Sequence, residues 1–147
     1  MKIIQKNKKA YFDYEILQEF KAGIMLLGSE IKSVRGGNVN LKGAYISLKD
    51  GKPALKGASI ARYAYDTTPD YDPFRDRPLL LKQPEIDRIE SKLNTQGVTL
   101  IPLMIGLSGK YAKLQIGLAR GKKKHDKRQS LKNQDAKRQI QRAMKGI

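Results

Sequence analysis

The stretch Y-A-K-L-Q-I-G-L-A-R-G-K-K-K-H-D-K-R, residues 111–128, joins two chemically different parts of the chain. In its first half, polar residues alternate with the apolar residues Ala112, Leu114, Ile116 and Leu118. This period of two is typical of a half-buried β-strand. Its second half is a run of cations in which no strand pattern remains. We therefore predict a folded body at residues 1–119 and a basic tail at residues 120–147.

The tail carries a large share of the chain's charge. Between residues 119 and 147 there are eleven Lys or Arg and two Asp, so eleven cations less two acids give +9 of the net +16. Such a block repels itself unless a polyanion accepts it. The charge favours nucleic acid as the partner, with an anionic membrane as the alternative. No apolar run approaches the roughly 20 residues of a membrane span, so we expect no membrane partner.

Composition excludes most enzyme classes. The 147 residues contain no cysteine and one histidine. Disulfides, thiolate metal sites and cysteine nucleophiles are therefore absent, and neither a histidine-based zinc site nor a Ser-His-Asp triad is expected. The acids are scattered and form no carboxylate cluster of the kind that a nuclease needs. We expect a binding protein that is not an enzyme and that needs no metal or cofactor.

Length and the amino terminus set two further expectations. A chain of 147 residues holds one ordinary domain with a modest core, but hardly two. Residues 1–9 have too little apolar length before their lysines for a secretory signal, so we expect a cytoplasmic protein.

The first half of the body predicts two strands and a helix. The strands are expected at residues 14–20 and 24–27, separated by a turn or bulge at Lys21-Ala22-Gly23, so that they form either a hairpin or one bent strand. A short helix should follow to Arg35, with Ser29 as its amino-terminal cap and Gly36-Gly37 as its stop.

The second half predicts two hairpins with a loop and a helix between them. Asp50-Gly51-Lys52 indicates a tight turn between strands at residues 44–49 and 54–60. Residues 62–78 contain Pro69, Pro73 and Pro78 among aromatic residues, which favours a long surface loop. A helix should begin near Pro84 and end at Gly97, with Ile86, Ile89 and Leu93 on its apolar face. The last hairpin should join residues 98–107 to 111–119.

These elements sum to about six short strands and two helices without a βαβ rhythm. We therefore predict a mainly β fold, a small antiparallel OB-like barrel with inserted short helices.

Several motifs, in order, resemble the SsrA-binding proteins, the small protein B family that partners bacterial transfer-messenger RNA. They are N-K-K-A-x-x-D-Y-E-I-L at 7–17, A-G-I at 22–24, G-S-E-I-K-S-V-R at 28–35, D-P-x-R-x-R-x-L-L-L at 72–81 and L-A-R-G-K-K-K-H-D-K-R at 118–128. The resemblance implies an OB-like barrel that binds the tRNA-like part of this RNA and delivers it to ribosomes stalled on messages lacking a stop codon. The chain departs from the family at residues 105–107, where an aromatic residue is common and this chain has Ile-Gly-Leu.

The predicted short helix and the residues after it could contact RNA. They offer phosphate donors, amide donors and a ring for stacking in Lys32, Arg35, Asn38, Asn40 and Tyr45. The alternative is that the cations are ordinary solvated helix charges. Glu30 has two interpretations as well: an acid that stabilises the helix start, or, as the resemblance implies, a polar contact to RNA.

Where the body meets the tail, consecutive cations suggest a phosphate clamp. The candidates for RNA binding are Arg120, Lys122, Lys123 and Lys124, and the alternative is a solubilising run. For residues 72–81 we favour a structural role, because Asp-Pro turns and Asp–Arg pairing can hold a loop without a ligand.

The resemblance assigns the rest of the tail to the ribosome. It places His125, whose ring could stack on an unpaired base, at the decoding site, together with Asp126, Lys127 and Arg128. We expect the tail to be disordered in the free protein, which should be monomeric, and helical from about Ser130 when it enters the empty message channel of the small subunit. A thin apolar stripe at helical spacing supports this expectation: Ala136, Ile140, Ala143, Met144 and Ile147.

One alternative of another class remains. A generic OB-type single-strand RNA-binding protein or ribosomal protein would explain the charge and the barrel equally well, but not a tail with latent helical amphipathicity.

Overall fold

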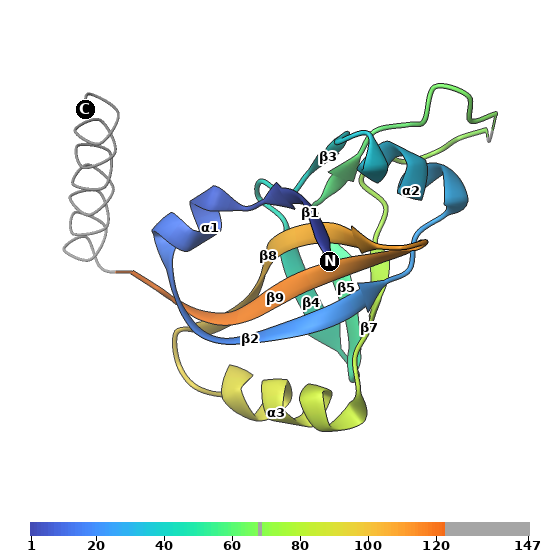
Figure 1. The fold of residues 1–147 in the computed structure, drawn as a ribbon. Coiled ribbons are helices and arrows are strands. Elements are labelled where there is room, and N and C mark those ends of the chain that lie inside the picture. Colours follow the sequence, from blue (N-terminus) through green and yellow to red (C-terminus); the bar gives the residue numbers. More distant parts are fainter. Residues whose placement is uncertain (68, 123–147) are drawn as a thin grey trace, which may run out of the picture.

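The computed structural model describes residues 1–67 and 69–122, and within them nine strands and three helices (Figure 1). In chain order these are β1 Lys2–Lys6, α1 Lys8–Asp13, β2 Tyr14–Ile24, α2 Gly28–Arg35, β3 Val39–Asn40, β4 Tyr45–Lys49, β5 Lys52–Lys56, β6 Ser59–Ile60, β7 Arg77–Leu80, α3 Gln83–Leu93, β8 Val98–Ser108 and β9 Tyr111–Gly121. The predicted six strands and two helices were too few, because β1, α1, β7 and the two-residue strand β3 were missed.

The strands form a curled antiparallel sheet. Its order is β1-β8-β9-β2-β7-β5-β4, and β3 pairs separately with β6. Every strand pair is antiparallel. The sheet bends so that β4, at one edge, contacts β8 near the other, and the main apolar cluster fills the space enclosed. The predicted mainly β, antiparallel OB-like architecture with inserted short helices is confirmed.

The last hairpin supplies β8 and β9, the two strands that lie between β1 and β2 in the sheet. β8 and β9 are eleven residues each, and the predicted inward face of β9 is buried. Ala112, Leu114, Ile116 and Leu118 are all at most 4% exposed. The strand continues past residue 119 to Gly121, because Tyr14 of β2 pairs with Gly121.

The predicted turn or bulge at residues 21–23 was wrong, and of the two predicted arrangements the structure has a single strand and not a hairpin. Lys21, Ala22 and Gly23 continue the ladder opposite Gln115, Leu114 and Lys113, so one strand runs to Ile24. The long partner strand β9 supplies continuous hydrogen bonds that a local glycine signal cannot reveal. Gly23 lies where a Cβ would come within 3.3 Å of the Leu80 side chain, so it serves the close approach of β7 and not a turn.

The β4–β5 turn is as predicted. Asp50 and Gly51 both have positive φ, 55° and 69°, the signature of a two-residue type I′ hairpin turn. The second strand is shorter than predicted, because Gly57 turns the chain with φ +75° and residues 59–60 pair with β3. The predicted loop 62–78 ends earlier too, since Arg77 and Pro78 already belong to β7.

Helix α3 lies across one end of the strands, at the bottom of Figure 1. Pro84 stands in its first turn, and Ile86 and Ile89 are buried. Both features were predicted. The helix ends at Leu93 with Asn94 as its cap, before the predicted stop at Gly97.

The amino-terminal segment packs against β8. Ile3 pairs with Gly106, where a Cβ would lie 2.4 Å from the carbonyl oxygen of Lys2. A side chain at position 106 is therefore incompatible with β1 in this place. The side chain of Gln5 in β1 makes two further hydrogen bonds. Its Nε2 donates to the carbonyl of Val39, and its Oε1 accepts from the amide of Leu41, each at 2.7 Å.

None of the helices in residues 1–67 and 69–122 is both long and apolar enough to span a membrane.

Candidate nucleic-acid interface

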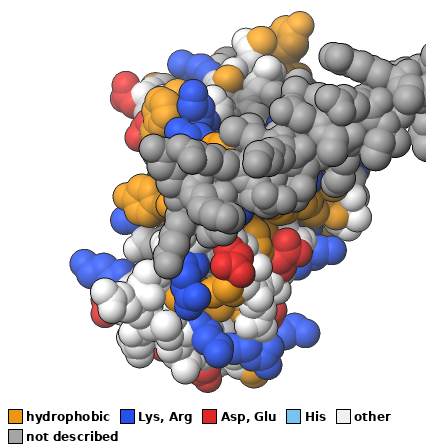
Figure 2. Space-filling view, turned by 90° about the vertical axis from the view of Figure 1, so that its left-hand side faces the viewer, with side chains coloured by type: hydrophobic (Ala, Val, Ile, Leu, Met, Phe, Trp, Pro, Cys, Tyr) orange, Lys and Arg blue, Asp and Glu red, His pale blue; other side chains and the backbone are white. Residues whose placement is uncertain are grey.

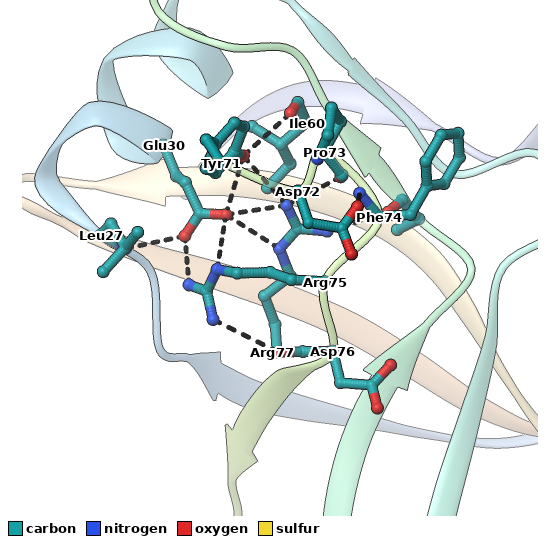
Figure 3. Close-up of polar contacts among 11 residues, drawn as sticks. Leu27, Glu30, Ile60, Tyr71, Asp72, Pro73, Phe74, Arg75, Asp76 and Arg77 are labelled. Atoms are coloured by element: carbon teal, nitrogen blue, oxygen red, sulfur yellow. Dashed lines mark hydrogen bonds and ion pairs between the residues drawn. The ribbon is translucent and has the colours of Figure 1, made fainter. Parts of the chain in front are cut away.

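Glu30 lies at the centre of a buried polar network beneath α2 (Figure 3). One of its carboxylate oxygens, Oε1, accepts a 2.8 Å hydrogen bond from the Leu27 amide and is ion-paired with Arg75. The other, Oε2, accepts from the Tyr71 hydroxyl at 3.0 Å and from Arg77 Nη2 at 2.7 Å. The side chains of Glu30 and Arg77 are both fully buried.

Arg77 extends the network into the barrel wall. Its guanidinium donates to the carbonyl of Ala58 at 2.9 Å and to that of Pro73 at 3.0 Å. The one hydrogen of the Tyr71 hydroxyl is shared between Glu30 and the carbonyl oxygen of Ile60, which lies 2.9 Å from the hydroxyl oxygen. The carboxylate thus ties the start of α2 to the loop before β7 and, through Arg77, to the segment around β6.

The network keeps Glu30 ionised. Burial alone raises a carboxyl pKa, but hydrogen bonds from Arg75, from the Leu27 amide and from Arg77 outweigh burial and hold the pKa of Glu30 at about 2. Burial, and next the neighbouring carboxylate, raise the pKa of Tyr71. At neutral pH the Glu30 carboxylate is therefore charged and the Tyr71 hydroxyl keeps its proton.

The prediction that Glu30 contacts RNA directly is wrong for this structure. The residue is 1% exposed and its side chain is enclosed by protein donors, so RNA cannot reach it. The predicted cap is also corrected: Leu27 is the N-cap residue of α2, and the Glu30 carboxylate caps its amide.

The expected structural role of residues 72–81 has a different basis from the one predicted. Asp72 accepts from the Phe74 amide at 2.9 Å, as an Asp-Pro turn should. The arginines, however, pair with Glu30 of α2. The sequence does contain a signal for this pairing, which was not used in the prediction. The alternation R-x-R at 75–77 puts both arginine side chains on one face of an extended segment, where they can share one acidic partner.

The predicted contacts around α2 lie together on the surface. Lys32, Arg35, Asn38 and Asn40 are all exposed, the first two on α2, Asn38 in the turn that follows it and Asn40 in β3. Lys32 Nζ lies 5.3 Å from the centroid of the Tyr63 ring, a cation–π contact. The exposed cations remain available to a phosphate backbone.

Tyr45 lies in a different place, at the start of β4. Its ring is 53% exposed and lines an open-sided cavity against α1. Lys9 and Asp13 of α1 contribute to the rim of this cavity. Sequence reasoning missed Lys9 because α1 was not predicted, although Asn7, which caps the helix, is a recognisable start signal.

The end of β9 brings the start of the tail beside α1. The Lys122 amide donates to the carbonyl of Asp13 at 2.8 Å. Arg120 lines a different hollow, together with Lys92 and Val98. The structure therefore divides the predicted contacts among α2, the Tyr45 cavity and the end of β9.

Six predicted residues lie outside the described part of the chain: Lys123, Lys124, His125, Asp126, Lys127 and Arg128. In Figure 2, which views the molecule from the α1 side, Lys and Arg side chains are scattered over the visible surface, with acidic and hydrophobic side chains between them. Within residues 1–67 and 69–122 there is no group of three or more potential metal-ligating side chains.

Comparisons with known proteins agree over nearly the whole chain. The family described as SmpB protein matches residues 4–146. The chain is 44% identical to an SsrA-binding protein from Thermosynechococcus vestitus, over 99% of this chain and 96% of that one. It is 46% identical to an SsrA-binding protein from Roseiflexus sp., over 98% and 92%.

A solved structure has a similar fold. It is described as "tmRNA-SmpB: a journey to the center of the bacterial ribosome", with a TM-score of 0.68 and 42% sequence identity over 82% of this chain and 85% of that one.

Proposed function

The chain belongs to the SmpB family, and from this premise we propose that it rescues stalled ribosomes by trans-translation. It binds the tRNA-like domain of transfer-messenger RNA in the bacterial cytoplasm and delivers that RNA to ribosomes stalled on messages lacking a stop codon. The protein acts by binding and performs no chemical step of its own.

The observation that carries this proposal is the family match over residues 4–146, which includes both the barrel and the basic tail. The charge agrees with it, because a net +16 on 147 residues needs a polyanionic partner. On the barrel, Lys32, Arg35 and Lys122 supply phosphate contacts, and Asn38 and Asn40 supply polar donors.

The tail has a second task in this proposal. The tail leaves the barrel beside α1, where β9 ends at Gly121, and the segment beginning at His125 reaches the decoding site of the small ribosomal subunit. From about Ser130 the tail becomes helical in the message channel, which is empty only when no message occupies it. Phosphates of the channel remove the self-repulsion that opposes a helix in the free chain.

The experiment compares the affinity of the full chain for the tRNA-like domain of transfer-messenger RNA with its affinity for unstructured RNA of equal length. Preference for the tRNA-like domain is expected. Equal affinity for both RNAs would instead favour a generic OB-type single-strand RNA-binding protein.

The salt dependence of RNA binding tests the proposed footprint, that is, the phosphate contacts of Lys32, Arg35 and Lys122. Each lost phosphate contact should lower the slope of log affinity against log salt by about 0.7–0.9, so the combined Ala variant at Lys32, Arg35 and Lys122 should bind more weakly and less salt-dependently. Glu85→Gln and Asp87→Asn, on α3, are control changes outside the proposed footprint. An unchanged slope in the triple variant would contradict the footprint.

A further inference from the structure

The cavity between α1 and Tyr45 has the form of a small binding site. It measures about 290 Å³, close to the lower end of the roughly 300–1,000 Å³ typical of small-ligand pockets. Its apolar lining includes Ala10 and Ile101, which are each 6% exposed, and the half-exposed Tyr45 ring forms one wall. An apolar floor beside an aromatic ring suits a flat ring system better than a peptide or an ion.

The walls of the cavity are held by short contacts from rigid elements. The Asn7 side chain donates to the carbonyl of Pro102 at 3.0 Å, and its backbone amide donates to that of Leu103 at 2.7 Å. These two bonds fix the start of α1 against β8. On the opposite wall, a Cβ at Gly57 would lie 3.3 Å from the carbonyl oxygen of Gly43 and 3.7 Å from Tyr45 Cε1. Residues 43–45 are therefore packed closely on Gly57, in the connection between β5 and β6. This packing positions the Tyr45 ring before any ligand binds.

The lining of the cavity carries one cation, Lys9, and one acid, Asp13. Lys9 lines the cavity, Lys42 immediately precedes the lining residue Gly43, and the backbone of Lys122 bonds to that of Asp13. Asp13 is the one acid that lines this cavity among the described residues. An apolar, aromatic hollow with one lysine suits a nucleotide, because the base is flat and apolar on its faces and Lys9 can contact the negative phosphate.

We propose that this cavity takes up one unpaired nucleotide of the bound RNA. The base stacks on the Tyr45 ring above Ala10 and Ile101, and its phosphate lies near Lys9. This inference rests on the proposed function and deepens it, because it assigns single-nucleotide recognition to one cavity and separates it from the phosphate contacts of α2. Fully paired RNA keeps its bases stacked inside the helix and cannot fill the cavity.

The test uses the full chain with two RNA hairpins that differ only by one bulged 2-aminopurine, a fluorescent base. The chain should bind the bulged hairpin more tightly and quench its fluorescence. Tyr45→Ala should lose the quenching and about fivefold or more of the affinity for the bulged hairpin, as loss of one base stack predicts, while the paired hairpin binds as before. Tyr45→Phe, which keeps the ring, should retain both properties.

Controls come from the opposite end of the β8–β9 hairpin. Tyr111 is 73% exposed and its neighbour Lys110 is exposed too, so Tyr111→Ala and Lys110→Ala match Tyr45→Ala and Lys9→Ala in chemistry. The Tyr111→Ala and Lys110→Ala variants should not alter the preference for the bulge. Lys9→Ala, which leaves the stacking ring in place, should weaken binding of the bulged hairpin and lower the salt slope by about 0.7–0.9.

Two results would overturn the inference: absence of quenching with the unmodified chain, or quenching that survives Tyr45→Ala. Either can occur while the chain still prefers the tRNA-like domain over unstructured RNA, in which case the proposed function stands without this cavity. Loss of that preference in the unmodified chain would instead contradict the proposed function.

Discussion

Glu30 and Glu85 occupy the same position in two helices but have different surroundings. Each is the third residue of its helix, and each carboxylate accepts from the N-cap amide, Leu27 at 2.8 Å and Lys82 at 3.2 Å. Glu85 is half-buried, and the hydrogen bond from the Lys82 amide is its one polar contact among the described residues, whereas Glu30 is also bonded to two arginines in the interior. The sequence pattern was the same, so only the tertiary partners distinguish a surface cap from a buried ion pair.

Glu30→Gln should therefore destabilise the protein far more than Glu85→Gln. Without the carboxylate, the fully buried Arg77 loses its counter-charge, and breaking a buried pair typically costs about 3–5 kcal/mol. Loss of the Glu85 cap should cost about 1 kcal/mol or less. Denaturant unfolding of both variants measures the difference. Equal free energies of unfolding would show that the network contributes no more than a helix cap.

The same carboxylate predicts an acid sensitivity. Its pKa in the folded protein is about 2, below the ordinary 4.5, so its contribution to stability is present above about pH 4.5 and is lost as pH falls toward 2. A shift of this size corresponds to on the order of 3 kcal/mol. The unfolding free energy of the unmodified chain should decline over this range more steeply than that of Glu30→Gln. Parallel pH profiles would contradict the depressed pKa.

At the scale of elements, local signals identified some parts of the fold and missed others. The Asp50-Gly51 turn and the alternation in β9 were predicted because turn geometry and strand period are properties of a few neighbouring residues. The continuity of β2 and the existence of β1 were missed, because both depend on pairing with residues 90 to 107 positions away in the sequence.

A substitution at Gly106 tests whether β1 needs a residue without a side chain at this position of β8. A Cβ there would meet the Lys2 carbonyl oxygen at 2.4 Å and Met1 Cγ at 2.6 Å, so Gly106→Ala should displace β1 and cost about 1–3 kcal/mol. Amide hydrogen exchange of residues 2–6 should become faster. Gly121→Ala, in the same hairpin with nothing within 4 Å, should leave exchange unchanged. Slow exchange of β1 in Gly106→Ala would mean that the backbone accommodates a side chain there.

At the scale of the molecule, the candidate site was predicted in part. The exposed positions of Lys32, Arg35, Asn38 and Asn40 follow from their place on and after an amphipathic helix. Their separation from Tyr45, and the approach of Lys122 to α1, depend on how the sheet closes. No pattern within one segment carries that information.

The two parts of the chain should be separable in function. In the proposed division, the barrel binds the RNA and residues 130–147 act only on the ribosome. A chain that ends at residue 129 should therefore keep its affinity for the tRNA-like domain. Binding measurements on both lengths check this, and a large loss of affinity would assign the tail to RNA binding instead.

The central claim is that this protein brings transfer-messenger RNA to stalled ribosomes. The most direct measurement is peptide tagging in a reconstituted bacterial translation system that is stalled at the end of a message lacking a stop codon. With transfer-messenger RNA present, the full chain should produce tagged peptide, and the chain ending at residue 129 should not. Tagging of equal extent without the protein, or none with the full chain, would contradict the account.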